Sequence, residues 1–155
     1  MISPELLKQY PFFGPFSETQ LREIAMISDE LTAVKGSILF EEGKPANELY
    51  LLIDGNVDLY YLTQEEFRQK VVKEFLVGEI NSGEIFGISV LIEPFIYSAS
   101  AHVSQTCKYL RIEGDELRDL LEKDTKMGCL FLRQINKVLM ERLSYTRVQL
   151  AAAWS

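Results

Sequence analysis

The spacing of hydrophobic residues along the chain changes type twice, near Leu31 and near Gly114. Before Leu31, apolar residues recur at the interval of three to four that is typical of a helix. Ser17, followed three positions later by Gln20, is typical of a helix N-cap. The pattern therefore predicts N-terminal helices within about residues 3–28.

Between about residues 31 and 112 the apolar spacing becomes two, which predicts strands with one buried face. The pair Asp54-Gly55 stands between two alternating runs and predicts a tight hairpin, and the polar stretch 63–69 predicts a longer, exposed hairpin tip. Eight or so short antiparallel strands in a roll or barrel would satisfy this pattern. The alternating residues include Ile38, Phe40, Leu49, Leu51, Ile53, Val57, Leu59, Tyr61, Ala99, Ala101 and Val103.

After Gly114 the helical interval returns and predicts a short helix at about 114–123 and a long one at about 125–150. The long helix is apolar over more than the ~100° arc that one core contact requires. Either both apolar stripes pack on the roll, or one of them packs on a second copy of the chain. We expect the second arrangement, a homodimer, with Phe131, Ile135, Val138, Leu139 and Tyr145 on its dimer helix. One stripe contains Leu132, Ile135, Leu139, Leu143 and Leu150, and the other contains Phe131, Val138 and Tyr145.

Composition narrows the class of protein. A chain of 155 residues with 47% hydrophobic and 25% charged residues predicts one domain with a packed core. A net charge of −7 disfavours contact with nucleic acid or anionic membrane. The N-terminus lacks the features of a signal peptide, and no apolar run is long enough to span a membrane. We expect a cytoplasmic protein with reduced thiols.

Candidate chemistry is sparse. His102 is the only histidine, and Cys107 and Cys129 form no CxxC pair, which excludes metal centres built from several such ligands. We expect a surface position for His102 and apolar packing for both cysteines. No nucleophile stands beside a base, so we predict no enzyme, and no haem attachment motif is present. No cofactor is certain from these residues, and a small-molecule effector stays open.

Three segments carry a family resemblance: KGSILFEEG at 35–43, ELYLLIDGNV at 48–57 and GEIFG at 83–87. In this order, and within about residues 3–150, they resemble the cyclic-nucleotide-binding domain family, here as a catabolite-activator-like sensor domain without a DNA-binding domain. The resemblance implies a mainly β fold with flanking helices. Its centre is an antiparallel double-stranded β-helix, a jelly-roll-like β-roll, followed by a long C-terminal helix.

The resemblance also implies a phosphate-binding cassette after Phe86-Gly87, with amides and an arginine for the phosphate and a glutamate for the ribose. This chain has Ile88 where the family carries the glutamate and Tyr97 where it carries the arginine. Burying a phosphate without a cation costs on the order of several kcal/mol, so we expect cyclic AMP binding to be weak or lost. The candidate cassette residues are Gly83, Glu84, Phe86, Gly87, Ile88, Ser89, Tyr97, Ser98 and Ala99.

Three alternatives remain open at this stage. Arg133, Lys137 or Arg142 of the long helix, which covers the pocket in the family, could supply the missing cation and make a genuine cyclic nucleotide receptor. The apolar cassette could instead accept an apolar or aromatic metabolite. Its side chains could also fill the pocket, leaving a purely structural dimerisation domain.

The expected function is therefore a non-enzymatic sensor that couples pocket occupancy to the pose of the long helix. Because the chain stops at Ser155, we expect no helix-turn-helix domain, no direct DNA binding and a downstream protein partner. The segment 63–69 and the tail with Trp154 are the candidate contact surfaces for that partner.

Overall fold

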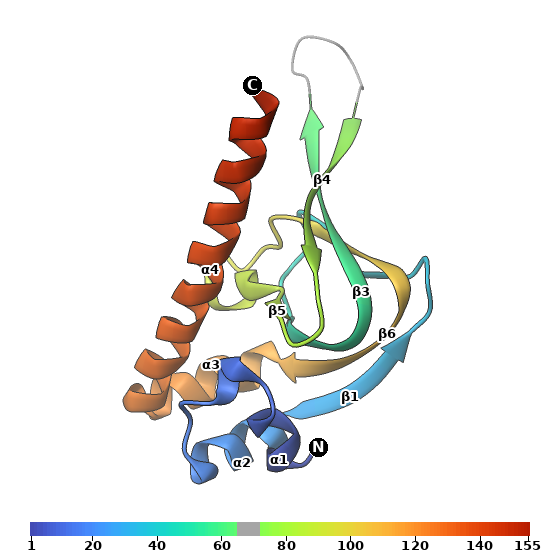
Figure 1. Ribbon diagram of the computed structural model, residues 1–155. Helices are drawn as coiled ribbons and strands as arrows, with labels where there is room; N and C mark the ends of the chain where they lie inside the picture. The colour runs from blue at the N-terminus through green and yellow to red at the C-terminus, as the bar shows by residue number, and fades with distance from the viewer. Residues whose placement is uncertain (65–71) are drawn as a thin grey trace.

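The computed structural model describes residues 1–64 and 72–155 (Figure 1). A helical N-terminal segment precedes a curved antiparallel sheet, and two helices follow it. The elements are α1 (Pro4–Lys8), η1 (Pro11–Phe13), α2 (Glu18–Met26), β1 (Ser28–Ala33), β2 (Ile38–Phe40), β3 (Glu48–Gln64), β4 (Val72–Ile80), β5 (Ile85–Phe86), η2 (Ile88–Leu91), β6 (Ser100–Glu113), α3 (Gly114–Lys123) and α4 (Thr125–Ala153).

The sheet is antiparallel throughout and confirms the predicted fold class, mainly β with flanking helices. Its strand order is β1-β6-β3-β4, with β2 paired to β6 and β5 paired to β3. The long strands β3 and β6 curve around the roll, and α4 runs beside the hairpin of β3 and β4 (Figure 1). Apart from its first two residues, the hairpin tip predicted at 63–69 lies outside the described residues.

The hairpin predicted at Asp54-Gly55 is not formed. β3 continues through this pair, and its register against β6 shifts on both sides of Asp54, which marks a bulge. Gly55 has φ +95° and supplies the left-handed residue that the bulge needs. A bulge bends a strand without ending it, so the sheet of the described residues has six strands, two of them long, where the pattern predicted about eight short ones.

Capping interactions explain where the helices begin. The Ser17 hydroxyl accepts from the Gln20 amide at 3.2 Å and the Gln20 side chain accepts from the Ser17 amide at 2.9 Å, a capping box at the start of α2. The Asp124 carboxylate accepts from the Met127 amide at 3.0 Å and caps α4. The short and long C-terminal helices lie where the sequence predicted them.

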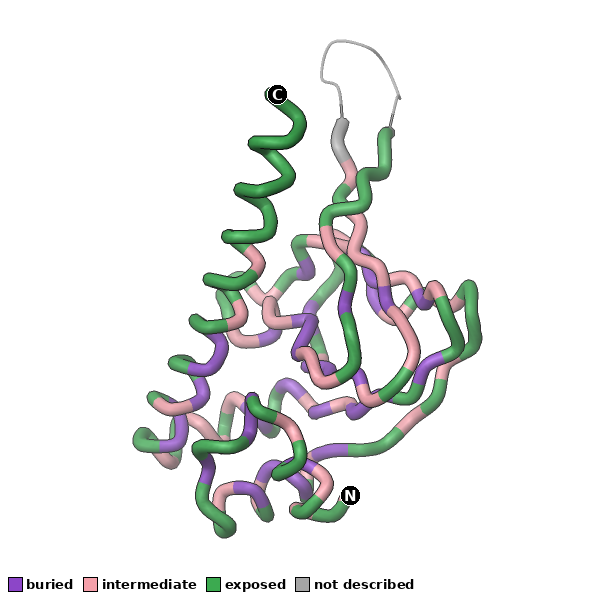
Figure 2. The backbone as a smooth tube through the Cα atoms, viewed as in Figure 1, coloured by how far each residue is buried: buried purple, intermediate pink, exposed green. Residues whose placement is uncertain are grey.

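The first half of α4 packs on the N-terminal helices, and its second half is largely exposed (Figure 2). The Phe131 ring lies 5.2 Å from Phe12, 6.4 Å from Phe13 and 5.7 Å from Phe16, measured between ring centroids. The Gln134 side chain donates to the Phe12 carbonyl at 2.9 Å. This aromatic cluster anchors the first half of α4 to the N-terminal helices.

The cysteines differ in their surroundings. Cys107 is buried as predicted, and burial raises the pKa of its thiol. Cys129 lies exposed on α4, so its predicted apolar packing is wrong. His102 is partly exposed, with its Nε2 3.4 Å from the Glu74 carboxylate.

Among the described residues, no helix has the length and hydropathy needed to cross a membrane.

Candidate functional site

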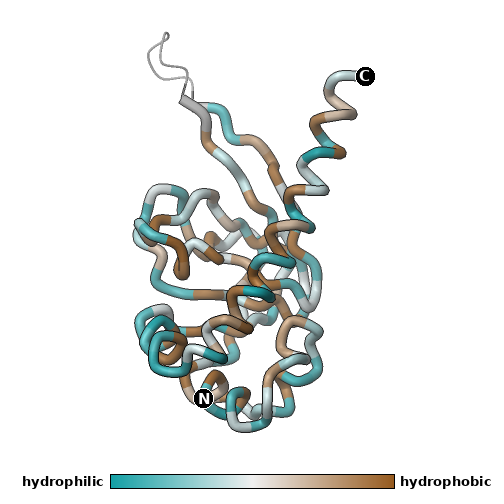
Figure 3. The backbone as a smooth tube through the Cα atoms, turned by 90° about the vertical axis from the view of Figure 1, so that its left-hand side faces the viewer, coloured by the Kyte–Doolittle hydropathy of each residue, from teal (hydrophilic) through white to brown (hydrophobic). Residues whose placement is uncertain are grey.

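A cavity of about 470 Å³ lies between the β3–β4 hairpin, the segment that follows β4, and α4. Hydrophobic and hydrophilic residues alternate along α4 (Figure 3). The helix contributes residues of both kinds to the cavity wall. The wall combines aliphatic side chains with carboxylates and one guanidinium. Its residues are Leu59, Val77, Gly78, Glu79, Ile80, Asn81, Glu84, Ile88, Ser98, Val138, Leu139, Glu141, Arg142, Tyr145 and Thr146.

Arg142 reaches from α4 across the cavity to the roll. Its guanidinium donates a hydrogen bond to the backbone carbonyl of Ile85 in β5. Burial lowers the pKa of this guanidinium, and the carboxylates of Glu84 and Glu141 act in the opposite direction. Arg133 and Lys137, the other two cations considered from the sequence, are exposed and do not line the cavity. Of the three, Arg142 is therefore the one placed to contact an occupant.

The segment from β5 through η2 has a tightly constrained backbone. Gly87 has φ +76° and caps η2, and a Cβ there would lie 2.9 Å from the Tyr50 ring and 3.2 Å from the Glu48 carbonyl oxygen. Phe86 is fully buried, whereas Ile88 faces the cavity. The turn at Gly87 thus directs the next side chain toward the cavity while its predecessor enters the core.

Tyr97 is turned into the core. Its hydroxyl donates to the Glu48 carbonyl at 2.7 Å and accepts from the Glu48 amide at 3.2 Å. Its ring stacks on Phe40 with centroids 4.0 Å apart, and burial raises the pKa of the phenol. Tyr97 is absent from the cavity wall, while the next residue, Ser98, is exposed and lines it.

The family model for the cyclic nucleotide-binding domain matches residues 30–124, which contain nearly all of the sheet, the part of the cavity wall outside α4, and α3. This chain belongs to the cyclic nucleotide-binding domain family. The resemblance inferred from the three sequence segments is thereby confirmed.

Solved structures agree with this assignment. A protein of Geobacter metallireducens GS-15, assigned to the cyclic nucleotide-binding proteins, is 33% identical over 92% of this chain and 99% of its own, with a TM-score of 0.79. The sensor domain of the transcriptional regulator DNR from Pseudomonas aeruginosa is 25% identical over 90% and 95%, with a TM-score of 0.70. An uncharacterised protein of Haemophilus influenzae is 25% identical over 131 residues, covering 84% of this chain and 97% of its own length.

Within this cyclic nucleotide-binding domain, the candidate cassette residues divide into two groups. Three of them line the cavity: Glu84, Ile88 and Ser98. Arg142 of α4, which is not a cassette residue, lines it as well. The remaining cassette residues support the turn or the core and do not line the cavity: Gly83, Phe86, Gly87, Ser89, Tyr97 and Ala99.

Sequence reasoning missed the contribution of β3 and β4 to the cavity of the domain. Leu59, Val77 and Glu79 line it, yet alternation shows only that a strand has two faces and not which face borders a cavity. Conversely, Val138, Leu139 and Tyr145, expected on a dimer helix, line the cavity in the single chain. The turn-forming sequence Asn81-Ser82-Gly83, just before the cassette, is a local signal that the end of β4 lies beside it.

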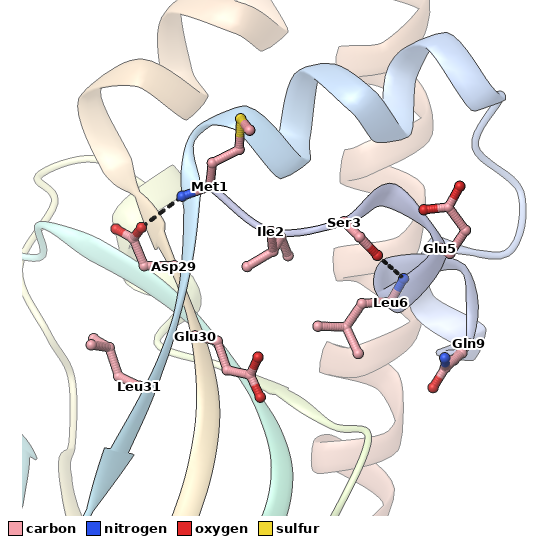
Figure 4. Close-up of a pocket in the computed structure, with 9 residues that line it drawn as sticks. All are labelled: Met1, Ile2, Ser3, Glu5, Leu6, Gln9, Asp29, Glu30 and Leu31. Carbon is pink, nitrogen blue, oxygen red and sulfur yellow. Dashed lines mark hydrogen bonds and ion pairs between the residues drawn. The ribbon is translucent and has the colours of Figure 1, made fainter.

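A second cavity of the domain, about 570 Å³, lies at the N-terminus between α1 and β1 (Figure 4). The Met1 ammonium group lies 2.9 Å from the Asp29 carboxylate, and this hydrogen bond lowers the pKa of Asp29. The Ser3 hydroxyl caps α1 by accepting from the Leu6 amide at 3.3 Å. These polar groups satisfy one another, so the cavity beside α4 is the stronger candidate site.

Proposed function

We propose that this domain is a non-enzymatic ligand sensor in which occupancy of the cavity changes the pose of α4. The observation that carries the proposal is Arg142, which extends from α4 and donates to the Ile85 carbonyl of the roll. An occupant that competes for this contact, or that pushes Val138 of α4 away from the opposite wall, would move the helix. Only a difference in affinity between the two poses can drive such a switch.

The packing of α4 favours this coupling. Its first half is held by buried Phe131 and Ile135, whereas Leu139 and Leu143 are 39% and 44% exposed. Few apolar contacts therefore oppose a movement of the second half, and low local packing is typical of elements that move. The guanidinium of Arg142 is thus well placed to report on the cavity.

We further propose that the cassette binds cyclic nucleotides weakly or not at all. Ile88 presents an aliphatic side chain where the family resemblance implies a ribose-binding carboxylate. The Tyr97 hydroxyl already donates a hydrogen bond to the Glu48 carbonyl. Isothermal titration with cyclic AMP and cyclic GMP at low millimolar concentration is expected to give no binding isotherm. Micromolar affinity for either nucleotide would contradict the proposal.

A genuine cyclic nucleotide receptor is the second candidate, and Arg142 is the observation that favours it. A guanidinium in the cavity wall could pair with the phosphate if it left the Ile85 carbonyl. In that case Arg142→Met would abolish binding, while Arg133→Met, which changes an exposed guanidinium outside the cavity, would leave it intact. Equal loss in both variants would exclude Arg142 as the phosphate ligand.

We propose that α4 also forms a homodimer. A seam of exposed positions spaced alternately by three and four residues follows the helix, as in a two-stranded coiled coil. Leu132, Leu139, Leu143 and Leu150 are 39 to 58% exposed in the single chain, an apolar surface that a second copy would cover. The seam positions are Cys129, Leu132, Asn136, Leu139, Leu143, Thr146 and Leu150.

This seam predicts a specific cross-link. In a parallel dimer the two Cys129 thiols meet, so mild oxidation is expected to give a disulfide-linked dimer on a non-reducing gel, while the buried thiol of Cys107 is protected. Leu139→Glu is expected to abolish the cross-link and yield a folded monomer by light scattering. Met140→Glu is the matched control, because Met140 is 60% exposed but lies off the seam. A wild-type monomer at high concentration would refute the dimer.

The output of the sensor is proposed to be another protein. Trp154 is 84% exposed at the end of α4, where a movement of the helix would be largest. Exposed tryptophans are frequent anchors of protein interfaces. The C-terminal end of α4 is thus the candidate contact for the downstream partner.

A further inference from the structure

We propose that the occupant of the cavity beside α4 is an amphipathic organic cation, an apolar body that carries a protonated amine. The inference deepens the proposed sensing function, on which it rests, by naming the chemical class of the ligand. It follows from the charge of the wall, from its apolar surface and from the existing engagement of Arg142.

Carboxylates dominate the charged groups of the wall. Glu79 of β4, Glu84 before β5 and Glu141 of α4 all line the cavity. Among the described residues, none of these three carboxylates forms an ion pair with a basic group within 4.0 Å. The Glu84 carboxylate accepts a hydrogen bond from the backbone amide of Asn81 at 3.1 Å. Three elements therefore direct negative charge toward one space, which attracts a cation and repels an anion.

Among the described residues of the wall, one guanidinium, that of Arg142, stands against three carboxylates and offsets only part of their charge. Arg142 is directed at the Ile85 carbonyl, and an anion would have to break that hydrogen bond to reach it. The sequence has no lysine or arginine between Glu74 and Cys107, so the cassette offers an anion no second cation. An anionic occupant would therefore lose a hydrogen bond and face three carboxylates, whereas a cation leaves Arg142 in place.

The rest of the wall sets the body of the ligand. Leu59, Val77, Ile88, Val138 and Leu139 offer aliphatic surface, and a volume of about 470 Å³ is within the range of small-molecule pockets. The phenol ring of Tyr145 adds an aromatic face, which attracts organic ammonium groups. The geometry thus suits an aryl or alkyl amine better than a sugar phosphate.

Three probes of equal shape and different charge test the inference: 2-phenylethylamine, 2-phenylethanol and phenylacetate. Isothermal titration and thermal shift of the full chain are expected to show binding of the amine, with the alcohol and the acid weaker by roughly tenfold or more. Glu84→Gln keeps the acceptor for the Asn81 amide and removes the charge, so it is expected to weaken the amine by roughly tenfold. Glu122→Gln, an exposed position on α3 outside the cavity, is the control.

Equal binding of the alcohol and the amine, tighter binding of phenylacetate, or no binding of any probe would each overturn the inference. The fluorescence of Trp154, the one tryptophan of the sequence, provides a separate reading of the α4 pose, because it lies at the end of the helix that is proposed to move. If the amine binds and leaves that fluorescence unchanged, the ligand class stands and the sensing function fails. If the amine does not bind but another metabolite changes the fluorescence, the sensing function stands and the ligand class is wrong.

Discussion

Replacing Gly55 by alanine is expected to lower the free energy of unfolding by about 3 kcal/mol or more, because the added Cβ has no room. It would lie 2.5 Å from the Thr106 carbonyl oxygen and 2.7 Å from the Cys107 Cα, both backbone atoms of the paired strand β6. The positive φ of +95° adds backbone strain. The bulge that bends β3 would have to open, and the roll would lose its curvature there.

Gly36→Ala separates the two causes. Gly36 has nearly the same φ, +93°, but a Cβ there would meet nothing within 4 Å. Its cost is therefore expected to be the backbone strain alone, about 1–2 kcal/mol. Urea denaturation of both variants, followed by circular dichroism, measures the difference. Equal losses of stability would show that the approach of β6 to Gly55 is not tight.

Replacing Phe131 by alanine is expected to lower the free energy of unfolding by about 3–5 kcal/mol. Phe131 is fully buried, and its ring meets Phe12, Phe13 and Phe16 from η1 and the turn after it. Removing the ring leaves a cavity that the rigid aromatic neighbours cannot fill. The substitution would also release the anchored end of α4 from the N-terminal helices.

Leu132→Ala is the matched control for this prediction. Leu132 is the next residue on the same helix, but it is 49% exposed in the single chain. Measured on the monomeric Leu139→Glu background, its truncation is expected to cost less than about 1 kcal/mol. Thermal denaturation of the two variants on that background provides the comparison. A larger loss for Leu132 than for Phe131 would contradict the described packing of α4.

The proposed sensing cavity borders the helix that is proposed to form the dimer. Val138 and Leu139 belong both to the cavity wall and to the helix proposed to carry the dimer. A ligand at this border and a second copy of the chain would therefore contact neighbouring turns of α4. If both proposals hold, this proximity would give occupancy a short physical route to the dimer interface.

Local interactions allowed the sequence by itself to determine much of this protein. The capping pair Ser17 and Gln20, the helical intervals after Gly114 and the alternation between residues 31 and 112 each act within a few positions, and the structure has the corresponding helices and strands. The three family segments likewise predicted the β-roll. The expectation that Ile88 and Tyr97 replace the two polar anchors of the cassette also came from the sequence alone, through the family resemblance.

Only the tertiary structure decided features that depend on distant partners. Gly55 forms a bulge and not a hairpin because β3 pairs with β6 on both sides of it. Arg142, and neither Arg133 nor Lys137, reaches the cavity because the packing of Phe131 sets the rotation of α4 against the roll. Helical and strand periods specify which residues share a face, whereas contacts between elements far apart in sequence specify what that face meets.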